Sequence, residues 1–240
     1  MSDGEALVLA RCAGFVFRAP GFSHPDVPPA LRAGFAFVLS LAFAHGYVAG
    51  TSPARGGLIA ALASELILGA AIGTAASMLY DGAFSGGRAL DDYVGIRASV
   101  PNANVAAGAG FGRLWSLAFA TGFFTFGGYR FALEAFGRTF ETLPPGALVR
   151  TDALATFAEA LPATLLRAAL LVAGPAVAIA LVVQTGLAAI ARVVPRFSTF
   201  TLAFGVVYAA VVLATLAAMP ATLPASGSPW MNLSGLRALR

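Results

Sequence analysis

Few side chains in this sequence could carry out chemistry, and none stands at a spacing typical of an active site. The chain has two histidines, His24 and His45, and one cysteine, Cys12. It has no HExxH, GxSxG or phosphate-binding glycine loop, and its carboxylates are scattered. We therefore expect no enzyme, no metal ion and no cofactor. His45 lies inside an apolar run, where we expect a packing role, with proton relay as the alternative.

Glu65 is the carboxylate with the most unusual surroundings, because it stands in the apolar stretch LASELILGAAIG. A charge among apolar residues is costly unless it is paired, so Glu65 must face protein or water. One possible role is an ion site or a functional contact. The other is a bond to an arginine or to a backbone amide of a neighbouring helix, which the lack of a second acidic residue in a facing run favours. Gln184 is expected to form interhelical hydrogen bonds.

Two arginines, Arg192 and Arg196, flank Pro195 in the stretch ARVVPRFSTF, which lies between two apolar runs. Guanidinium groups in such a place need carboxylates, carbonyls or lipid phosphates as partners. The pair predicts either an anchor at the membrane surface or a fixed elbow that binds neighbouring subunits.

The elements that position these residues are expected to be membrane helices, because the composition is far more apolar than that of a soluble protein. Hydrophobic residues make up 58% of the chain and charged residues only 11%, against about 25% charged residues in an ordinary soluble domain. Lipid or neighbouring subunits must cover the apolar surface. The basic residues are all arginines, spread singly along the chain with no cluster beside aromatic residues, which argues against nucleic-acid binding.

Five runs without charge are candidates for helices that cross a bilayer, which takes about 20 apolar residues. They are residues 33–54, 66–80, 114–129, 168–191 and 197–236. The second run qualifies only if it starts near Gly57, and the third is short. Helix is the expected state, because a lone strand would leave its backbone unpaired in lipid. The sequence therefore predicts an all-α membrane-associated protein.

Small residues and prolines predict how these helices pack and bend. Gly69 and Gly73 form a GxxxG pair that lets two helices approach closely, although such spacings also arise by chance in chains rich in alanine and glycine. Pro162 and Pro175 lie before and within the fourth run and predict bent helices, since proline removes a backbone donor. A short helix is expected over residues 6–18, and the acidic start MSDGE predicts no cleaved leader.

Two segments are expected to interrupt the helices. Residues 81–113 contain charges among many glycines and are predicted to form a loop, which ends in the uncharged stretch SVPNANVAAGAG. The PPG stretch at 144–146 is predicted to be the main boundary of the chain. It separates an N-terminal helical part, residues 1–146, from a C-terminal helical hairpin with a short tail, residues 147–240.

Several short motifs follow one another in an order that is known from one protein family. They are Arg11 with Ala19-Pro20, Val27-Pro28 and Leu31-Arg32; Glu65, Gly69 and Gly73; Gly87, Leu90-Asp91 and Gly95; Gly127-Gly128; Thr139-Phe140 with Leu143-Pro144-Pro145-Gly146; and Arg192-Val193-Val194-Pro195 with Phe200. Together they resemble the FliR/SctT export-gate proteins of bacterial type III secretion, which occur in flagella and in injectisomes. The sequence departs from the family pattern at Gln184, Ala188, Arg196 and Ser198.

The resemblance implies a non-enzymatic subunit of a protein-export gate. In this family the N-terminal part resembles FliP/SctR proteins, the C-terminal hairpin resembles FliQ/SctS proteins, and the three pack as long kinked hairpins into a helical hetero-oligomer. The resemblance further implies FlhB/SctU-type and FlhA/SctV-type export proteins, unfolded secreted substrates and membrane lipid as partners. The location it implies is the bacterial inner membrane at the base of a flagellum or an injectisome, and the motifs leave both systems open.

The resemblance also implies which residues close the channel. The family's loop between the two central helices is a plug, which corresponds here to Ser99, Val100, Pro101, Asn102, Ala103 and Asn104. Inter-subunit or buried polar contacts are expected at Glu65, Gln184, Arg192, Pro195 and Arg196. Helix packing is expected at Gly69, Gly73, Gly127 and Gly128.

The rival hypothesis is an independent multi-span transporter or small-solute channel, with Glu65, His45 and Arg192 lining its path. A transporter should be stable alone or as a homo-oligomer in detergent, whereas a gate subunit should need its two unlike partners. An intramembrane enzyme is disfavoured, because the sequence has no paired catalytic groups.

Overall fold

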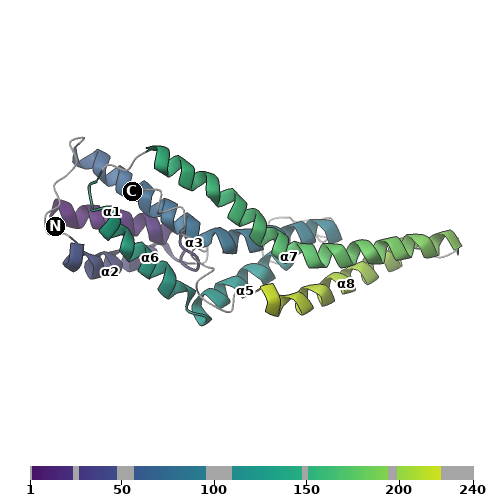
Figure 1. The fold of residues 1–240 in the computed structure, drawn as a ribbon. Helices are drawn as coiled ribbons and strands as arrows, with labels where there is room; N and C mark the ends of the chain where they lie inside the picture. Colours follow the sequence, from purple (N-terminus) through teal and green to yellow (C-terminus); the bar gives the residue numbers. More distant parts are fainter. Residues whose placement is uncertain are drawn as a thin grey trace. The chain divides into compact units, whose positions relative to one another are not determined.

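The computed structural model describes residues 2–23, 27–47, 57–95, 110–147, 151–193 and 199–222 (Figure 1). These residues form seven α-helices and no strand. The helices are α1 (Asp3–Arg18), α2 (Pro29–Tyr47), α3 (Leu58–Val94), α5 (Phe111–Thr125), α6 (Gly128–Thr142), α7 (Thr151–Val193) and α8 (Thr199–Thr222). The predicted all-α fold is confirmed for this part of the chain.

Four helices of the described part are long and apolar enough to cross a membrane. The segments are Pro29–Gly46, Leu58–Val94, Ala155–Val193 and Phe204–Thr222. The fifth candidate, the short run at 114–129, is not one continuous helix: it covers most of α5, which has 15 residues, and the first two residues of α6. A helix of this length rises about 22 Å, less than the roughly 30 Å of the hydrocarbon core. Helix α5 ends at Thr125, two residues before Gly127, whose φ of 76° lies in the left-handed region that favours glycine.

The prediction of a loop over residues 81–113 was wrong for residues 81–94, which continue α3 without a break, and for residues 111–113, which begin α5. Glycine disfavours a helix interior by about 1 kcal/mol relative to alanine, and this argued for a loop. In the fold, however, Gly82 and Gly86 lie where another helix approaches the backbone of α3. Ala83 and Leu90 are fully buried. Tertiary packing of this face therefore outweighs the low helix propensity of its glycines.

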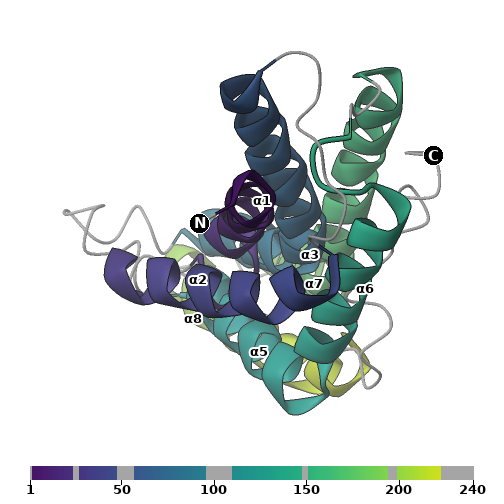
Figure 2. The ribbon, with the colours of Figure 1, turned by 90° about the vertical axis from the view of Figure 1, so that its left-hand side faces the viewer.

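Capping and the sequence at each end fix the length of α1. The Ser2 hydroxyl accepts the N–H of Glu5, and the Glu5 carboxylate accepts the N–H of Ser2 at 2.7 Å, which together form a capping box. The helix ends at Arg18 because Ala19 precedes Pro20 and has an extended backbone, with ψ 141°. Its buried residues are Gly4, Leu7, Val8, Arg11, Cys12, Gly14, Phe15 and Val16. This face packs inside the protein, and α1 lies beside α2 (Figure 2).

Glycines bring α1 and α3 into contact at the level of their backbones. A Cβ atom on Gly14 would collide with the backbone of α3, one on Gly69 would collide with the carbonyl oxygen of Arg11, and one on Gly73 would lie 2.5 Å from that of Phe15. Because the contacts advance in the same direction along both helices, α1 and this part of α3 run parallel. Small residues on a helix face permit such an approach.

The described residues divide into two compact units, each built from separate stretches of the chain. The described residues of the first unit lie within 2–78 and 122–163, and those of the second lie within 79–121 and 164–222. The predicted division into residues 1–146 and 147–240 concerns which partner each part resembles. Compactness does not test that division, and it stays a prediction.

Aromatic rings join the helices of the first unit, and small residues join those of the second. In the first unit, Phe15 of α1 stacks on Phe136 of α6 with ring centroids 4.3 Å apart, and Phe43 of α2 stacks on Phe140 at 5.3 Å. In the second unit, a Cβ atom on Gly82 of α3 would lie 2.6 Å from the side chain of α7 residue Ala168. Neither kind of contact involves a charged side chain.

Candidate functional site

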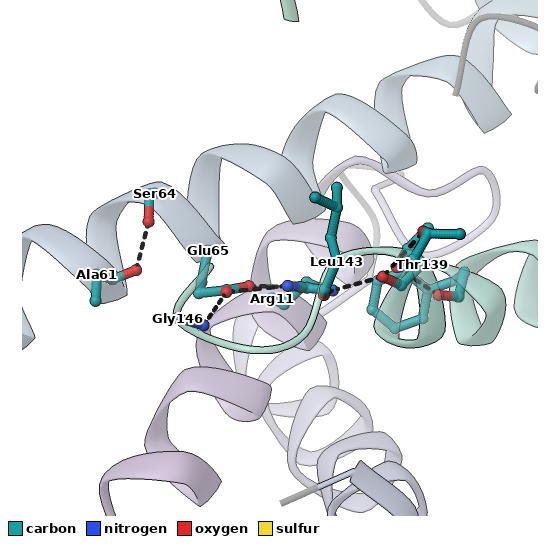
Figure 3. A network of polar contacts seen from close by, with 9 residues as sticks. Arg11, Ala61, Ser64, Glu65, Thr139, Leu143 and Gly146 are labelled. Carbon is teal, nitrogen blue, oxygen red and sulfur yellow. Dashed lines mark hydrogen bonds and ion pairs between the residues drawn. The ribbon is translucent and has the colours of Figure 1, made fainter. Parts of the chain in front are cut away.

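A buried ion pair joins α1 to α3 in the first unit (Figure 3). The side chain of Arg11 is 1% exposed and that of Glu65 is 2% exposed. Two parallel hydrogen bonds join them, from Arg11 Nε to Glu65 Oε2 at 2.5 Å and from Arg11 Nη2 to Glu65 Oε1 at 2.9 Å. Such a bidentate pair is among the stronger and more directional hydrogen-bonded arrangements in proteins.

The opposite side of the Arg11 guanidinium binds the C-terminal end of α6. Arg11 Nη1 donates to the carbonyl oxygens of Thr139 at 3.1 Å and Leu143 at 2.9 Å. Carbonyl groups at a helix C-terminus lack partners inside the helix and carry its negative partial charge, so a cation there is stabilised. The guanidinium carbon also lies 4.5 Å from the centroid of the Phe140 ring, a cation–π geometry.

Glu65 binds a third segment, the connection that follows α6. Its Oε1 atom accepts the backbone N–H of Gly146 at 2.8 Å. The φ angle of Gly146 is 85°, a left-handed conformation that side chains other than glycine rarely adopt. Arg11 and Glu65 thus tie together α1, α3, the end of α6 and the Leu143–Gly146 connection. We call these four residues, Arg11, Glu65, Leu143 and Gly146, the polar clamp.

The polar clamp is suited to holding helices together and has no free group for catalysis. Every carboxylate oxygen of Glu65 has a donor, and each nitrogen of Arg11 has an acceptor. Beside it, burial raises the pKa of the Cys12 thiol from its ordinary 9.0 to about 12; the Arg11 charge opposes this shift and the Glu65 charge adds to it. The thiol is therefore protonated at neutral pH. Within the described residues, no group of three potential ligands could hold a metal ion.

Sequence reasoning singled out Glu65 but did not identify its partner. The structure places Arg11 there, and it brings Glu65 together with Leu143 and Gly146, which the sequence connected only through the family pattern. A signal was present in the sequence, because Arg11 lies among the apolar residues that form the buried face of α1. The contacts of Arg11 with carbonyl groups 128 and 132 residues further along the chain could not be read from local spacing.

Two further predicted polar residues, Gln184 and Arg192, belong to the second unit. In the second unit, the Gln184 side chain accepts a hydrogen bond from the Tyr93 hydroxyl at 2.9 Å, which links α7 to α3. Arg192 lies in the last turn of α7 with an exposed side chain. Pro195 and Arg196 lie outside the described residues. The predicted plug, residues 99–104, also lies outside them.

Of the predicted packing glycines, Gly69 and Gly73 lie against α1, as described above. Gly127 and Gly128 separate α5 from α6: Gly127 is the N-cap of α6, and Gly128 is the first, buried residue of that helix. His45 is exposed near the end of α2, with Nδ1 3.4 Å from the carbonyl oxygen of Leu41. This position does not bring it to the polar clamp.

Comparison with known proteins relates the whole pattern to one family. A search of curated proteins finds no match. The family model for bacterial export proteins, family 1, matches residues 5–232, which include the polar clamp and all four candidate membrane-spanning helices. Since the match covers nearly the entire chain, this protein belongs to the bacterial export proteins, family 1, the FliR/SctT family, and is a membrane component of bacterial type III protein export.

Proposed function

We propose that the chain is a core subunit of the type III export gate, the inner-membrane channel that passes unfolded flagellar or effector proteins. In this proposal it forms the channel together with FliP/SctR-type and FliQ/SctS-type subunits, and residues 99–104 close the channel at rest. The chain lines the channel and closes it, and the energy for transport comes from other parts of the apparatus. Family membership over residues 5–232 is the observation that carries the proposal.

The exposed apolar surface of the long helices supports a role within a larger assembly. Ile59 on α3 is 84% exposed, Val182 on α7 is 73% exposed and Leu213 on α8 is 67% exposed. Apolar side chains on this scale need a cover of lipid or protein. In a subunit of a ring, the helices of neighbouring subunits would supply much of that cover. An independent transporter would leave it to lipid alone.

We assign the partners through the two parts of the chain. Residues 1–146 would occupy a place like that of a FliP/SctR-type subunit, and residues 147–240 one like that of a FliQ/SctS-type subunit. FlhB/SctU-type and FlhA/SctV-type proteins would then bind the assembled gate. The polar clamp suits this arrangement, because it fixes the Leu143–Gly146 connection, where the two parts meet, against α1 and α3.

Deleting residues 99–104 tests the closure. The expected result is a normal yield of the assembled complex, together with a membrane that becomes permeable to small ions in the absence of export. The matched control is deletion of the six residues 233–238, which lie beyond the family match and should leave ion permeability unchanged. A complex of normal composition whose ion permeability does not rise on deletion of residues 99–104 would contradict the proposed plug.

A further inference from the structure

In the second unit, the last turns of α3 meet the first turn of α5 around one buried carboxylate. Asp91, which is 4% exposed, accepts the N–H of Phe111 on Oδ1 at 2.6 Å and the N–H of Gly112 on Oδ2 at 3.1 Å. Backbone N–H groups in the first turn of a helix have no partner inside the helix, and the helix dipole favours a negative charge there. A side chain of α3 thus caps α5.

Glycines on both helices provide the space that this arrangement needs. A Cβ atom on Gly87 of α3 would lie 2.5 Å from the carbonyl oxygen of Phe111 and 2.7 Å from the Cα of Gly112. At Gly110, where φ is 109°, a Cβ atom would lie 2.5 to 2.8 Å from the Asp91 carboxylate. Any side chain at these positions would force the two helices or the carboxylate to move.

The same junction explains the sequence pattern that runs from Gly87 to Gly95. Gly87 permits the approach of α5, the Leu90 side chain is fully buried, and Asp91 caps α5. Gly95, with φ 78°, follows the last residue of α3 in the left-handed conformation typical of a helix end. Each position of the pattern therefore contributes to the way α3 ends and α5 begins.

We propose that Asp91 is a positioning residue of the export gate: by holding the first turn of α5 against the last turns of α3, it fixes both ends of the connection between these helices. This inference rests on the proposed function, which assigns the closure of the channel to residues of that connection. Tying the ends of a connection together reduces the number of conformations it can adopt. Without the hydrogen bonds of Asp91, we expect the subunit still to fold but residues 99–104 to close the channel less well.

Replacing Asp91 by Asn tests the inference, because asparagine has the same shape but only one accepting oxygen for the two amides, and no charge. A hydrogen bond to a charged group is strong enough that its loss should raise the population with a displaced α5 about tenfold or more. We expect resting ion permeability, measured with the complete complex in membranes, to rise by about the same factor if the flux follows this population.

The control is Asp92→Asn, which removes the same charge from the exposed neighbouring position. Recovery of the complex on purification reports folding and assembly separately from closure. Because Asp91→Asn could impair folding, Gly110→Ala is a second test: it retains the carboxylate but pushes on it. A leak in either variant, with the complex recovered normally and Asp92→Asn tight, supports the inference.

Two results would overturn the inference while leaving the proposed function standing. One is a tight membrane with a normal yield of complex in both Asp91→Asn and Gly110→Ala, while deletion of residues 99–104 causes a leak. The other is loss of the complex in both variants, which would show that Asp91 acts in folding. If deletion of residues 99–104 also leaves the membrane tight, the proposed plug fails and the inference fails with it.

Discussion

Replacing Glu65 by Gln should destabilise the protein strongly, although the change in side-chain size is minimal. Three donors meet the Glu65 carboxylate: Arg11 Nε, Arg11 Nη2 and the N–H of Gly146. The Gln side chain offers one accepting oxygen and an NH₂ group that would face another donor. The substitution therefore leaves the guanidinium of Arg11, which is 1% exposed, without a counter-ion.

The expected loss follows from the cost of an unpaired buried charge. Removing one partner of a buried ion pair typically lowers the free energy of unfolding by about 3 to 5 kcal/mol. The two carbonyl oxygens of Thr139 and Leu143 would still solvate the guanidinium, which argues for the lower half of this range. For a chain of this size, 1 kcal/mol shifts the melting temperature by about 2–4 °C. We therefore expect the melting temperature to fall by roughly 6–16 °C.

The chain contains a matched control for this measurement. Arg138 and Glu134 on α6 also form an Arg–Glu pair with a 2.5 Å contact, but their side chains are 70% and 57% exposed. Exposed pairs four residues apart on a helix contribute about 0.3 to 0.5 kcal/mol. Thermal unfolding of the detergent-solubilised protein, followed by circular dichroism, should thus distinguish Glu65→Gln from Glu134→Gln clearly.

A double-mutant cycle tests the cause of the loss. If the unpaired charge is responsible, Arg11→Met should cost less in the Glu65→Gln background than in the wild type, with a coupling of at least about 1 kcal/mol. Equal melting temperatures for Glu65→Gln and Glu134→Gln would refute the reasoning. Strictly additive effects of Arg11→Met and Glu65→Gln would refute it too.

Three further predictions follow from other parts of the structure. Gly69→Ala should lower the free energy of unfolding by about 1 to 3 kcal/mol, because its Cβ atom would collide with a backbone oxygen of α1. The control is Gly174→Ala, at a helical glycine with open space around it, which should raise the free energy of unfolding by up to about 1 kcal/mol. Chemical unfolding measures both changes. Burial raises the pKa of the Cys12 thiol from 9.0 to about 12, so the unfolded chain loses this proton first as pH rises. The free energy of unfolding should therefore fall by up to about 1.4 kcal/mol per pH unit between pH 9 and 12. In Cys12→Ala this contribution to the pH dependence should be missing. Arg192→Ala should lower recovery of the assembled complex more than recovery of the chain itself, as quantitative immunoblots of both would measure, and an equal loss of the two would indicate a folding role instead.

The sequence predicted the helices well where one physical cause dominates. The described residues of the long runs without charge lie in α2, α7 and α8, because in an apolar medium a helix pairs all its backbone hydrogen-bonding groups within itself. The prediction failed where two causes compete. Gly82 and Gly86 have low helix propensity, which favoured a loop, yet close packing of α3 in the second unit holds them in a helix.

The candidate site was predicted in part, for a similar reason. Burial of Glu65 among apolar residues implied a partner, and the cost of an unpaired charge implied that the partner is cationic or a backbone amide. Both kinds of partner are present, namely Arg11 and the N–H of Gly146. Their identity depends on how segments distant in sequence meet, which local spacing does not encode.

Native mass spectrometry of the particle purified from native membranes through this chain tests the central claim most directly. The account predicts a hetero-oligomer that contains this chain together with FliP/SctR-type and FliQ/SctS-type subunits. It predicts further that the apolar faces of α7 and α8 are protected from labelling in that particle, compared with the chain alone. A stable monomer or a homo-oligomer, with neither unlike subunit present, would contradict the account.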